Sequence, residues 1–160
     1  MLLLKICRFW NLWYVEVNER DRYMEIANPT KQYHHEPHSV HSCQYHIIFC
    51  PKYRRKVLED KIADRLKELV EEKQDEFGYE LLEMEVMPDH IHLLLDISPK
   101  TSIYTVIGKI KGHTSHTLRS EFPGLKKRIP TLWTRSSFIS SVGSVSLETV
   151  KKYIENQKNV

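Results

Sequence analysis

Residues 80–97 read ELLEMEVMPDHIHLLLDI, two apolar segments on either side of Pro88-Asp89. Both segments, 80–87 and 91–97, are rich in the aliphatic residues that are typical of strands. Proline and aspartate favour tight turns. This stretch therefore predicts two consecutive β-strands joined by a short turn.

A strand and a helix are predicted before these two strands. Residues 43–50, CQYHIIFC, are a β-rich apolar run that ends at Pro51 and is typical of a buried strand. Residues 60–77 carry apolar side chains at helical spacing, with acids and lysines on the other side: Ile62, Leu66, Leu69, Val70 and Phe77. Gly78 comes next, and glycine is favoured directly after a helix.

A second helix and a fourth strand are predicted after them. Residues 102–121 again show helical spacing, at Ile103, Val106, Ile107, Ile110 and Leu118. A basic loop from Pro123 to Pro130, a short strand at 137–142 and the breaker Gly143 follow, and Ser146 can cap a last helix that runs to about residue 157. The order βαββαβ predicts an α+β fold of the ferredoxin-like (RRM-like) type, an antiparallel four-stranded sheet with helices on one face.

Composition limits the class of protein. The chain has 160 residues, of which 41% are hydrophobic and 28% charged, as in one folded domain. No apolar run approaches the roughly 20 residues that span a bilayer, and Lys5 and Arg8 interrupt the apolar N-terminus, so we expect neither a membrane span nor a signal peptide. Three cysteines without a C-x-x-C pair suit the reducing cytoplasm. Residues 1–40, with their histidine-rich end, read as an N-terminal extension or arm, and residues 41–160 as the functional domain.

Charge is concentrated in one part of the chain. Between residues 100 and 135 the only acid is Glu121, and the basic residues are Lys100, Lys109, Lys111, Arg119, Lys126, Lys127, Arg128 and Arg135. Such a block suggests a polyanionic partner, most often nucleic acid, although a solvated basic face is an equal alternative.

The motif Asp89-His90-Ile91-His92 lies at the start of a predicted strand. Because side chains alternate along a strand, His90 and His92 project to one face, about 7 Å apart. Two imidazoles so placed can bind one divalent cation. The alternative is a pair of polar residues on a solvated sheet face.

A second candidate pair lies on the predicted last helix. Tyr153 and Gln157 stand four residues apart and therefore share one face of that helix. A tyrosine can act as a nucleophile, and the carbonyl oxygen of a glutamine can bind a hard cation. An ordinary surface tyrosine is the alternative.

Aromatic and basic residues also alternate in several short segments, which could stack on and hold single-stranded bases. The segments are Tyr45, Tyr53-Arg54-Arg55-Lys56, Tyr104 and Trp133-Thr134-Arg135. Trp133 and Phe138 could equally belong to the core, and we expect Phe138 there.

Four segments together resemble the small single-tyrosine HUH transposases of the IS200-like insertion-sequence family. They are residues 45–56 (YHIIFCPKYRRK), Asp89-His90-Ile91-His92, residues 130–134 (PTLWT) and residues 150–157 (VKKYIENQ). The resemblance covers roughly residues 40–158 with the motifs in the right order. It implies a homodimeric enzyme that cleaves and rejoins single-stranded DNA at the ends of its mobile element.

The resemblance also implies the roles of individual residues. His90 and His92 would bind a catalytic Mg²⁺ or Mn²⁺ ion that Gln157 completes, and Tyr153 would be the nucleophile that forms a 5′-phosphotyrosine. The active sites would be shared between the two subunits of the dimer. The DNA, with hairpins at the element ends, would contact a set of basic and aromatic residues: Lys52, Arg54, Arg55, Lys109, Lys111, Arg119, Trp133 and Arg135.

Two other functions remain compatible with these motifs. A replication initiator or conjugative relaxase uses the same H-x-H and tyrosine chemistry, but usually in larger chains. A non-catalytic RNA-recognition module shares the sheet topology and would need exposed aromatic residues on the central strands. In this sequence His90 and His92 occupy that position.

Overall fold

The computed structural model describes residues 33–142, which form two units, one ending at Ser42 and one beginning at Cys43. In the first unit, strands β1 (His34–Glu36) and β2 (Ser39–His41) pair antiparallel, and the rings of His34 and His41 stack with centroids 5.5 Å apart. This hairpin falls in the segment that the sequence suggests to be an arm. The predicted last helix, with Ser146, Tyr153 and Gln157, lies outside the described residues.

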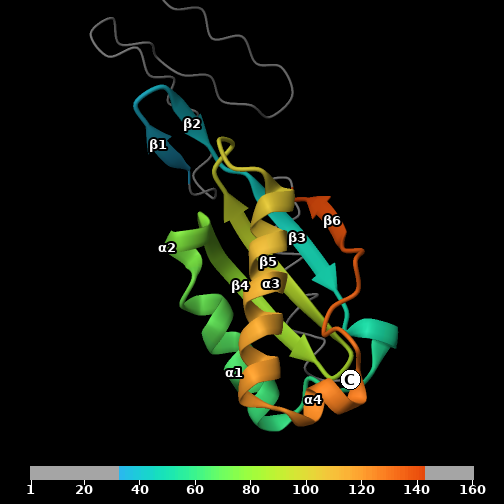
Figure 1. The fold of residues 1–160 in the computed structure, drawn as a ribbon. Coiled ribbons are helices and arrows are strands. Elements are labelled where there is room, and N and C mark those ends of the chain that lie inside the picture. Colours follow the sequence, from blue (N-terminus) through green and yellow to red (C-terminus); the bar gives the residue numbers. More distant parts are fainter. Residues whose placement is uncertain (1–32, 143–160) are drawn as a thin grey trace, which may run out of the picture. The chain divides into compact units, whose positions relative to one another are not determined.

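The second unit contains an antiparallel four-stranded sheet in the order β4-β5-β3-β6 (Figure 1). The strands are β3 (Gln44–Phe49), β4 (Tyr79–Met87), β5 (His90–Ile97) and β6 (Phe138–Ser141). The first and third strands of this unit are thus central, and the second and fourth are at the edges. This order is that of the ferredoxin-like fold, which confirms the predicted fold class.

Two long helices, α1 (Asp60–Glu71) and α3 (Ile103–Glu121), lie side by side across one face of the sheet (Figure 1). The guanidinium of Arg65 on α1 joins them, because its Nε lies 3.0 Å from a carboxylate oxygen of Glu121 at the end of α3. Glu68 and Glu72 contact the same guanidinium from one side of α1. The buried residues of both helices belong to the core against the sheet, whereas these charged groups lie on the outside.

The first helix is shorter than its periodicity predicts. It ends at Glu71, and a separate turn of helix, α2 (Gln74–Phe77), follows after Lys73, whose backbone (φ −107°, ψ 10°) leaves the helical region. The side-chain oxygen of Gln74 accepts a hydrogen bond from the amide of Leu81, at 2.7 Å, and this contact across the turn holds α2 against β4. Gly78 ends α2 in the left-handed conformation (φ 77°), as its position predicts.

Two further expectations differ from the structure. The segment from Pro123 to Pro130 is not all loop, because residues Gly124–Arg128 form helix α4, which buries Leu125. Phe138 is 56% exposed rather than in the core. Side chains alternate along β6, and it is the next residue, Ile139, that packs against the core.

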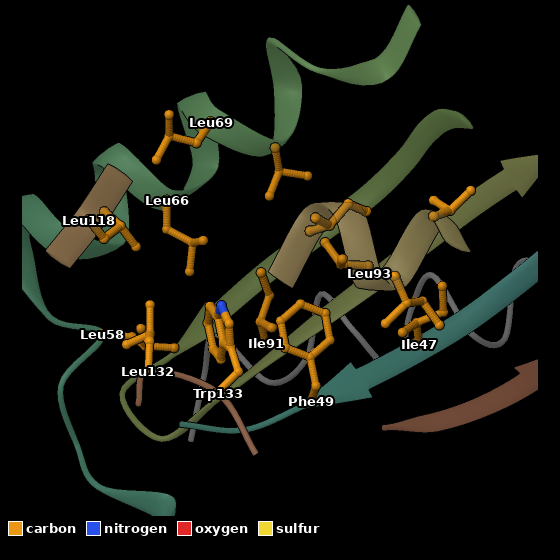
Figure 2. Close-up of a cluster of buried hydrophobic side chains, with 14 of the residues drawn as sticks. Ile47, Phe49, Leu58, Leu66, Leu69, Ile91, Leu93, Leu118, Leu132 and Trp133 are labelled. Atoms are coloured by element: carbon orange, nitrogen blue, oxygen red, sulfur yellow. The ribbon is translucent and has the colours of Figure 1, made fainter. Parts of the chain in front are cut away.

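The core lies between the helices and the sheet (Figure 2). Ile47 and Phe49 from β3 and Ile91 and Leu93 from β5 point toward the helices, where they meet side chains from α1, α3 and the loops around them: Leu58, Leu66, Leu69, Leu118, Leu132 and Trp133. Since the odd-numbered residues of both central strands fill this face, the even-numbered ones project from the opposite face. Between residues 33 and 142 no helix has the length and apolar character that a membrane span requires.

Candidate active site

The face of the sheet opposite the helices carries the two histidines of the H-x-H motif. His90 and His92 lie on this face at the start of β5, with ring centroids 4.9 Å apart. Leu94 continues the row in a small apolar cluster with Leu82 and Val142, separate from the main core. The two imidazoles are therefore side by side, as the strand alternation predicts.

The turn before β5 holds the ring of His90. The Nδ1 atom of His90 lies 2.6 Å from Oδ1 of Asp89, and the other carboxylate oxygen lies 2.9 Å from Nη2 of Arg54. Partial burial acts to raise the pKa of Asp89, but its contacts with His90 and Arg54 outweigh this effect and hold that pKa below its usual value. Asp89 is thus an anion placed between Arg54 and His90.

Arg54 reaches Asp89 from a turn with an unusual backbone. Tyr53 and Arg54 have φ values of 61° and 50°, a left-handed conformation that is uncommon for residues other than glycine. The amides of Val57 and Leu58, a few residues later, donate hydrogen bonds to the carbonyl of Pro88. The segment after β3 therefore wraps around the turn that precedes the H-x-H motif.

A third histidine belongs to the same cluster. The Nε2 atom of His46 on β3 lies 3.0 Å from Nδ1 of His92, and the two rings stack at an angle of 12°. His46 faces the same side as His92 because Ile47 enters the core beside it and the register pairs His46 with Leu94 of β5. None of the sequence motifs singles out His46. A signal for His46 does exist in the sequence, because the polar residues Gln44 and His46 alternate with core residues along β3. It is weak because the segment as a whole is apolar enough to be taken for a fully buried strand.

Burial keeps the inner histidines neutral. Burial lowers the pKa of His92 to about 4, with smaller contributions from the charges of His90 and His46, and burial also lowers the pKa of His46. A neutral imidazole is the form that binds a metal ion. For both His90 and His92 the Nδ1 atom already has a partner, so Nε2 is the atom through which each ring would bind a cation.

The remaining predicted parts of the site are not in the described part of the chain. Tyr153 and Gln157 lie outside it, and residues 33–142 contain no group of three His, Cys, Asp or Glu side chains that could hold a metal ion. The described residues thus supply two oriented nitrogen ligands, which suits a divalent ion that needs a further ligand.

Two motifs that are distant in the sequence lie next to each other beyond the end of β3. The amide of Lys52 donates to the carbonyl of Leu132 at 2.8 Å, and the amide of Thr134 donates to the carbonyl of Cys50 at 3.0 Å. Residues 52–55 and 133–135, both expected to contact DNA, are therefore adjacent. Of their side chains, Tyr53, Arg54, Arg55 and Arg135 are exposed.

Several of the residues expected to bind DNA make contacts within the fold. Trp133 is 7% exposed, its ring packs edge-on against Phe49, and its Nε1 donates to Thr114, so it has no free face for a base. The ammonium of Lys111 donates to the carbonyls of Arg135 and Ser136 and to the hydroxyl of Ser137, at 3.1–3.2 Å. Burial lowers the pKa of this ammonium.

The other two basic residues on α3 also lie apart from each other. Arg119 donates to the carbonyl of Ile129 at 2.9 Å. Lys109 is exposed, and its ammonium lies over the ring of Phe77 on α2, on the other side of α3 from the loop that Lys111 holds. The basic block of the sequence is thus divided over different surfaces of the protein.

A hollow of about 390 Å³ lies between α3 and the segment before β6. It is lined by Tyr104, Ile107, Gly108, Lys111, Ile139 and residues 134–137. Tyr104 is 76% exposed at this hollow, and Arg135 adds an exposed positive charge. An exposed ring beside a cation is a suitable surface for a nucleotide base.

Residues 39–157 match the family of IS200-like transposases, and the chain belongs to this family. It is 37% identical over 120 residues to the ISDra2 transposase TnpA of Deinococcus radiodurans, which covers 74% of this chain and 86% of the relative. It is 35% identical over 126 residues to the transposase of insertion sequence IS200 from Salmonella typhimurium, covering 75% and 80% of the two chains.

Solved structures give the same assignment. A crystal structure of a Deinococcus radiodurans protein assigned as a transposase superposes with a TM-score of 0.65 at 35% identity, covering 78% of this chain and 97% of that one. A REP-associated tyrosine transposase bound to a REP hairpin has a TM-score of 0.58 at 13% identity, over 72% of this chain and 66% of that one, and this likeness concerns the fold alone. The protein is therefore a DNA-processing enzyme of the single-tyrosine HUH transposase type.

Proposed function

We propose that this transposase cleaves and rejoins single-stranded DNA at the ends of an insertion sequence through a covalent bond to Tyr153. The observation that carries the proposal is the pair of imidazoles, His90 and His92, held side by side with both Nδ1 atoms engaged. We assign this chemistry to residues 41–160 as the catalytic domain and place it in the cytoplasm.

The proposed step is an in-line displacement at phosphorus. The phenol oxygen of Tyr153 attacks the scissile phosphate, loses its proton, and displaces the 3′-oxygen, which leaves as a 3′-hydroxyl. The phosphate stays on the 5′ side of the downstream nucleotide as a 5′-phosphotyrosine. Because this ester conserves the energy of the phosphodiester bond, a second 3′-hydroxyl can attack it, release Tyr153 and join new ends without a nucleotide cofactor.

Two described residues and one other would hold the metal ion. Nε2 of His90, Nε2 of His92 and the amide oxygen of Gln157 would bind Mg²⁺ or Mn²⁺, which would polarise the scissile phosphate and offset its charge. Asp89 holds the ring of His90 through its Nδ1 atom. The sheet itself fixes both ligands, since they extend from one rigid central strand.

The proposed DNA surface consists of residues around this face and the hollow beside α3. Arg55, Arg135 and the partly exposed Lys52 would contact phosphates there, and Lys109 would do so on the other side of α3. Tyr53, Tyr104 and Phe138 expose rings on which bases could stack. Single-stranded DNA with a hairpin beside the cleavage site is the substrate that family membership favours.

We also propose that the enzyme is a homodimer with shared active sites. β6 ends at Ser141, and the sequence Ser141-Val142-Gly143-Ser144 that leads toward the predicted helix of Tyr153 is short and made mostly of small residues. Such a linker can direct that helix to the sheet of a second subunit. Each H-x-H pair would then meet the tyrosine of the other subunit, giving two composite sites related by symmetry.

A cleavage assay tests this function. The substrate is a single-stranded oligonucleotide that carries the element end and its hairpin. Wild-type protein should cleave it in Mg²⁺ or Mn²⁺, and excess chelator should stop the cleavage. His90→Ala and His92→Ala should each abolish cutting while the protein stays folded. Full cleavage in chelator, or by both variants, would contradict the proposed metal site.

A further inference from the structure

We propose that His46 is a positioning residue for the metal centre: its Nε2 accepts a hydrogen bond from Nδ1–H of His92 and so fixes the tautomer in which His92 presents Nε2 to the metal ion. This inference rests on the proposed function, because it concerns the same site. His46 comes from β3, whereas both proposed histidine ligands come from β5.

The contact between the two rings is short and lies inside the protein. Nε2 of His46 and Nδ1 of His92 are 3.0 Å apart, and the rings stack with centroids 5.3 Å apart. His46 is 9% and His92 2% exposed. A hydrogen bond shielded from water in this way is kept, because breaking it would leave a buried polar atom without its partner, and it requires one ring to donate and the other to accept.

The chemistry of imidazole decides which ring donates. A neutral imidazole carries one proton, so one nitrogen donates and the other accepts. If His46 donated, the proton of His92 would be on Nε2, and that nitrogen could not bind a cation. Only the arrangement in which His92 donates from Nδ1 leaves an Nε2 lone pair for a metal ion.

The two proposed ligands are therefore held in different ways. The carboxylate of Asp89 accepts from Nδ1 of His90, whose side chain is 19% exposed, at the rim of the sheet. The neutral ring of His46 performs the same task for the more deeply buried His92.

Two substitutions of His46 distinguish the effect of losing the hydrogen bond from the effect of losing the volume of the ring. The amide of His46→Gln can place an oxygen near the position of Nε2 and accept the same bond. His46→Met has nearly the same length but offers only a thioether. If both variants fold, as judged by their thermal unfolding, the difference between them reports the hydrogen bond.

The first measurement uses the metal-free full-length protein and ¹⁵N NMR of the imidazole nitrogens. We expect the Nδ1–H tautomer of His92 in the wild type and in His46→Gln, and a mixture of tautomers in His46→Met. A wild-type His92 protonated at Nε2 would overturn the inference, and this result needs no variant to fold.

The second measurement is the affinity for Mn²⁺ alone, by calorimetric titration. Losing the partner of a metal-binding histidine typically costs roughly 10–100-fold in metal affinity, so His46→Met should bind Mn²⁺ that much more weakly and His46→Gln within a few-fold of the wild type. His92→Ala is the control for the site itself. If His92→Ala loses Mn²⁺ but His46→Met does not, only the role of His46 is wrong. If His92→Ala binds Mn²⁺ as tightly as the wild type, the proposed metal centre is wrong and this inference falls with it.

Discussion

The guanidinium of Arg54 and the carboxylate of Asp89 form an ion pair at 2.9 Å, and the second oxygen of that carboxylate contacts Nδ1 of His90. Arg54 comes from the turn after β3 and Asp89 from the turn before β5, so the pair joins the two central strands at the edge of the candidate site. The sequence suggests Arg54 as a DNA contact; in this structure its Nε and Nη2 atoms contact Asp89, and its side chain is 66% exposed.

Asp89 should matter more for the metal ion than for the fold. Asp89→Ala removes the acceptor that orients His90, and Mn²⁺ affinity should fall roughly 10-fold or more. Asp89→Asn keeps an oxygen that can accept from Nδ1 of His90, so the loss should be smaller. Calorimetric titration with Mn²⁺ measures both variants, and equal, wild-type affinities would show that Asp89 does not support the ligand.

Lys111 and Lys109 provide a matched pair on α3. Lys111→Met removes the three hydrogen bonds that hold residues 135–137, and the free energy of unfolding should fall by about 1–2 kcal/mol. Lys109→Met removes an exposed charge and its contact with the ring of Phe77, so the change should be smaller, at most about 0.5–1 kcal/mol. Urea unfolding measures both variants.

For DNA binding we expect the opposite order, with a larger effect of Lys109→Met than of Lys111→Met. Lys109→Met should lower the slope of log affinity against log salt by about one, as expected when one phosphate contact is lost. Fluorescence anisotropy with a labelled hairpin oligonucleotide measures this slope. If Lys109→Met unfolds as easily as Lys111→Met, or if its salt slope is unchanged, these separate roles are wrong.

At pH values below the usual pKa of histidine, acid should lower the free energy of unfolding of the metal-free protein. The folded state holds the pKa of His92 at about 4 and lowers that of His46, whereas in the unfolded chain both titrate near 6.5. Above that pH both states are neutral and these groups have no effect on stability. As the pH falls below it, the unfolded chain takes up protons that the folded protein does not, so stability is lost, by at most about 1.4 kcal/mol per pH unit for each group.

Urea unfolding at pH 7.5, 6.5 and 5.5 in excess chelator tests this dependence. His46→Gln removes one of the two titrating groups and should have a shallower loss. Stability that does not fall between pH 6.5 and 5.5 would show that the two imidazoles are not held neutral.

Mixed dimers test the shared active site. Tyr153→Phe lacks the nucleophile and the double variant His90→Ala/His92→Ala lacks the ligands, so neither should cleave DNA alone. When the two are co-expressed with different tags and purified as a heterodimer, one complete composite site should form, with about half of the wild-type activity. A verified heterodimer that stays inactive would mean that each site is built within one subunit.

Periodicity was sufficient to predict the sheet, the two long helices and the common face of His90 and His92. It was not sufficient where tertiary contacts decide the backbone. The end of α1 at Glu71 has no glycine or proline to mark it, and it coincides with contacts of the following turn with β4. Phe138 was misplaced because an aromatic residue in a short strand reads as core, and only the register shows which face it takes.

The site was predictable only where its residues form a compact motif. The H-x-H pair lies within three positions, but His46 reaches it from 46 positions away through strand pairing, which no local pattern reveals. The basic residues show a related limit. Lys111 and Arg119 donate to backbone carbonyls, and such acceptors have no signature in the sequence.

The measurement that tests the central claim most directly is the location of the covalent bond. Wild-type protein is incubated with Mn²⁺ and a single-stranded element end labelled at its 3′ terminus, and the labelled adduct is digested with trypsin. We predict that mass spectrometry finds the 5′-phosphate of the downstream DNA on the peptide YIENQK, residues 153–158, whose only tyrosine is Tyr153. Tyr153→Phe should give no adduct. An adduct on Tyr45, Tyr53 or Tyr104, or an undiminished adduct in Tyr153→Phe, would contradict the account.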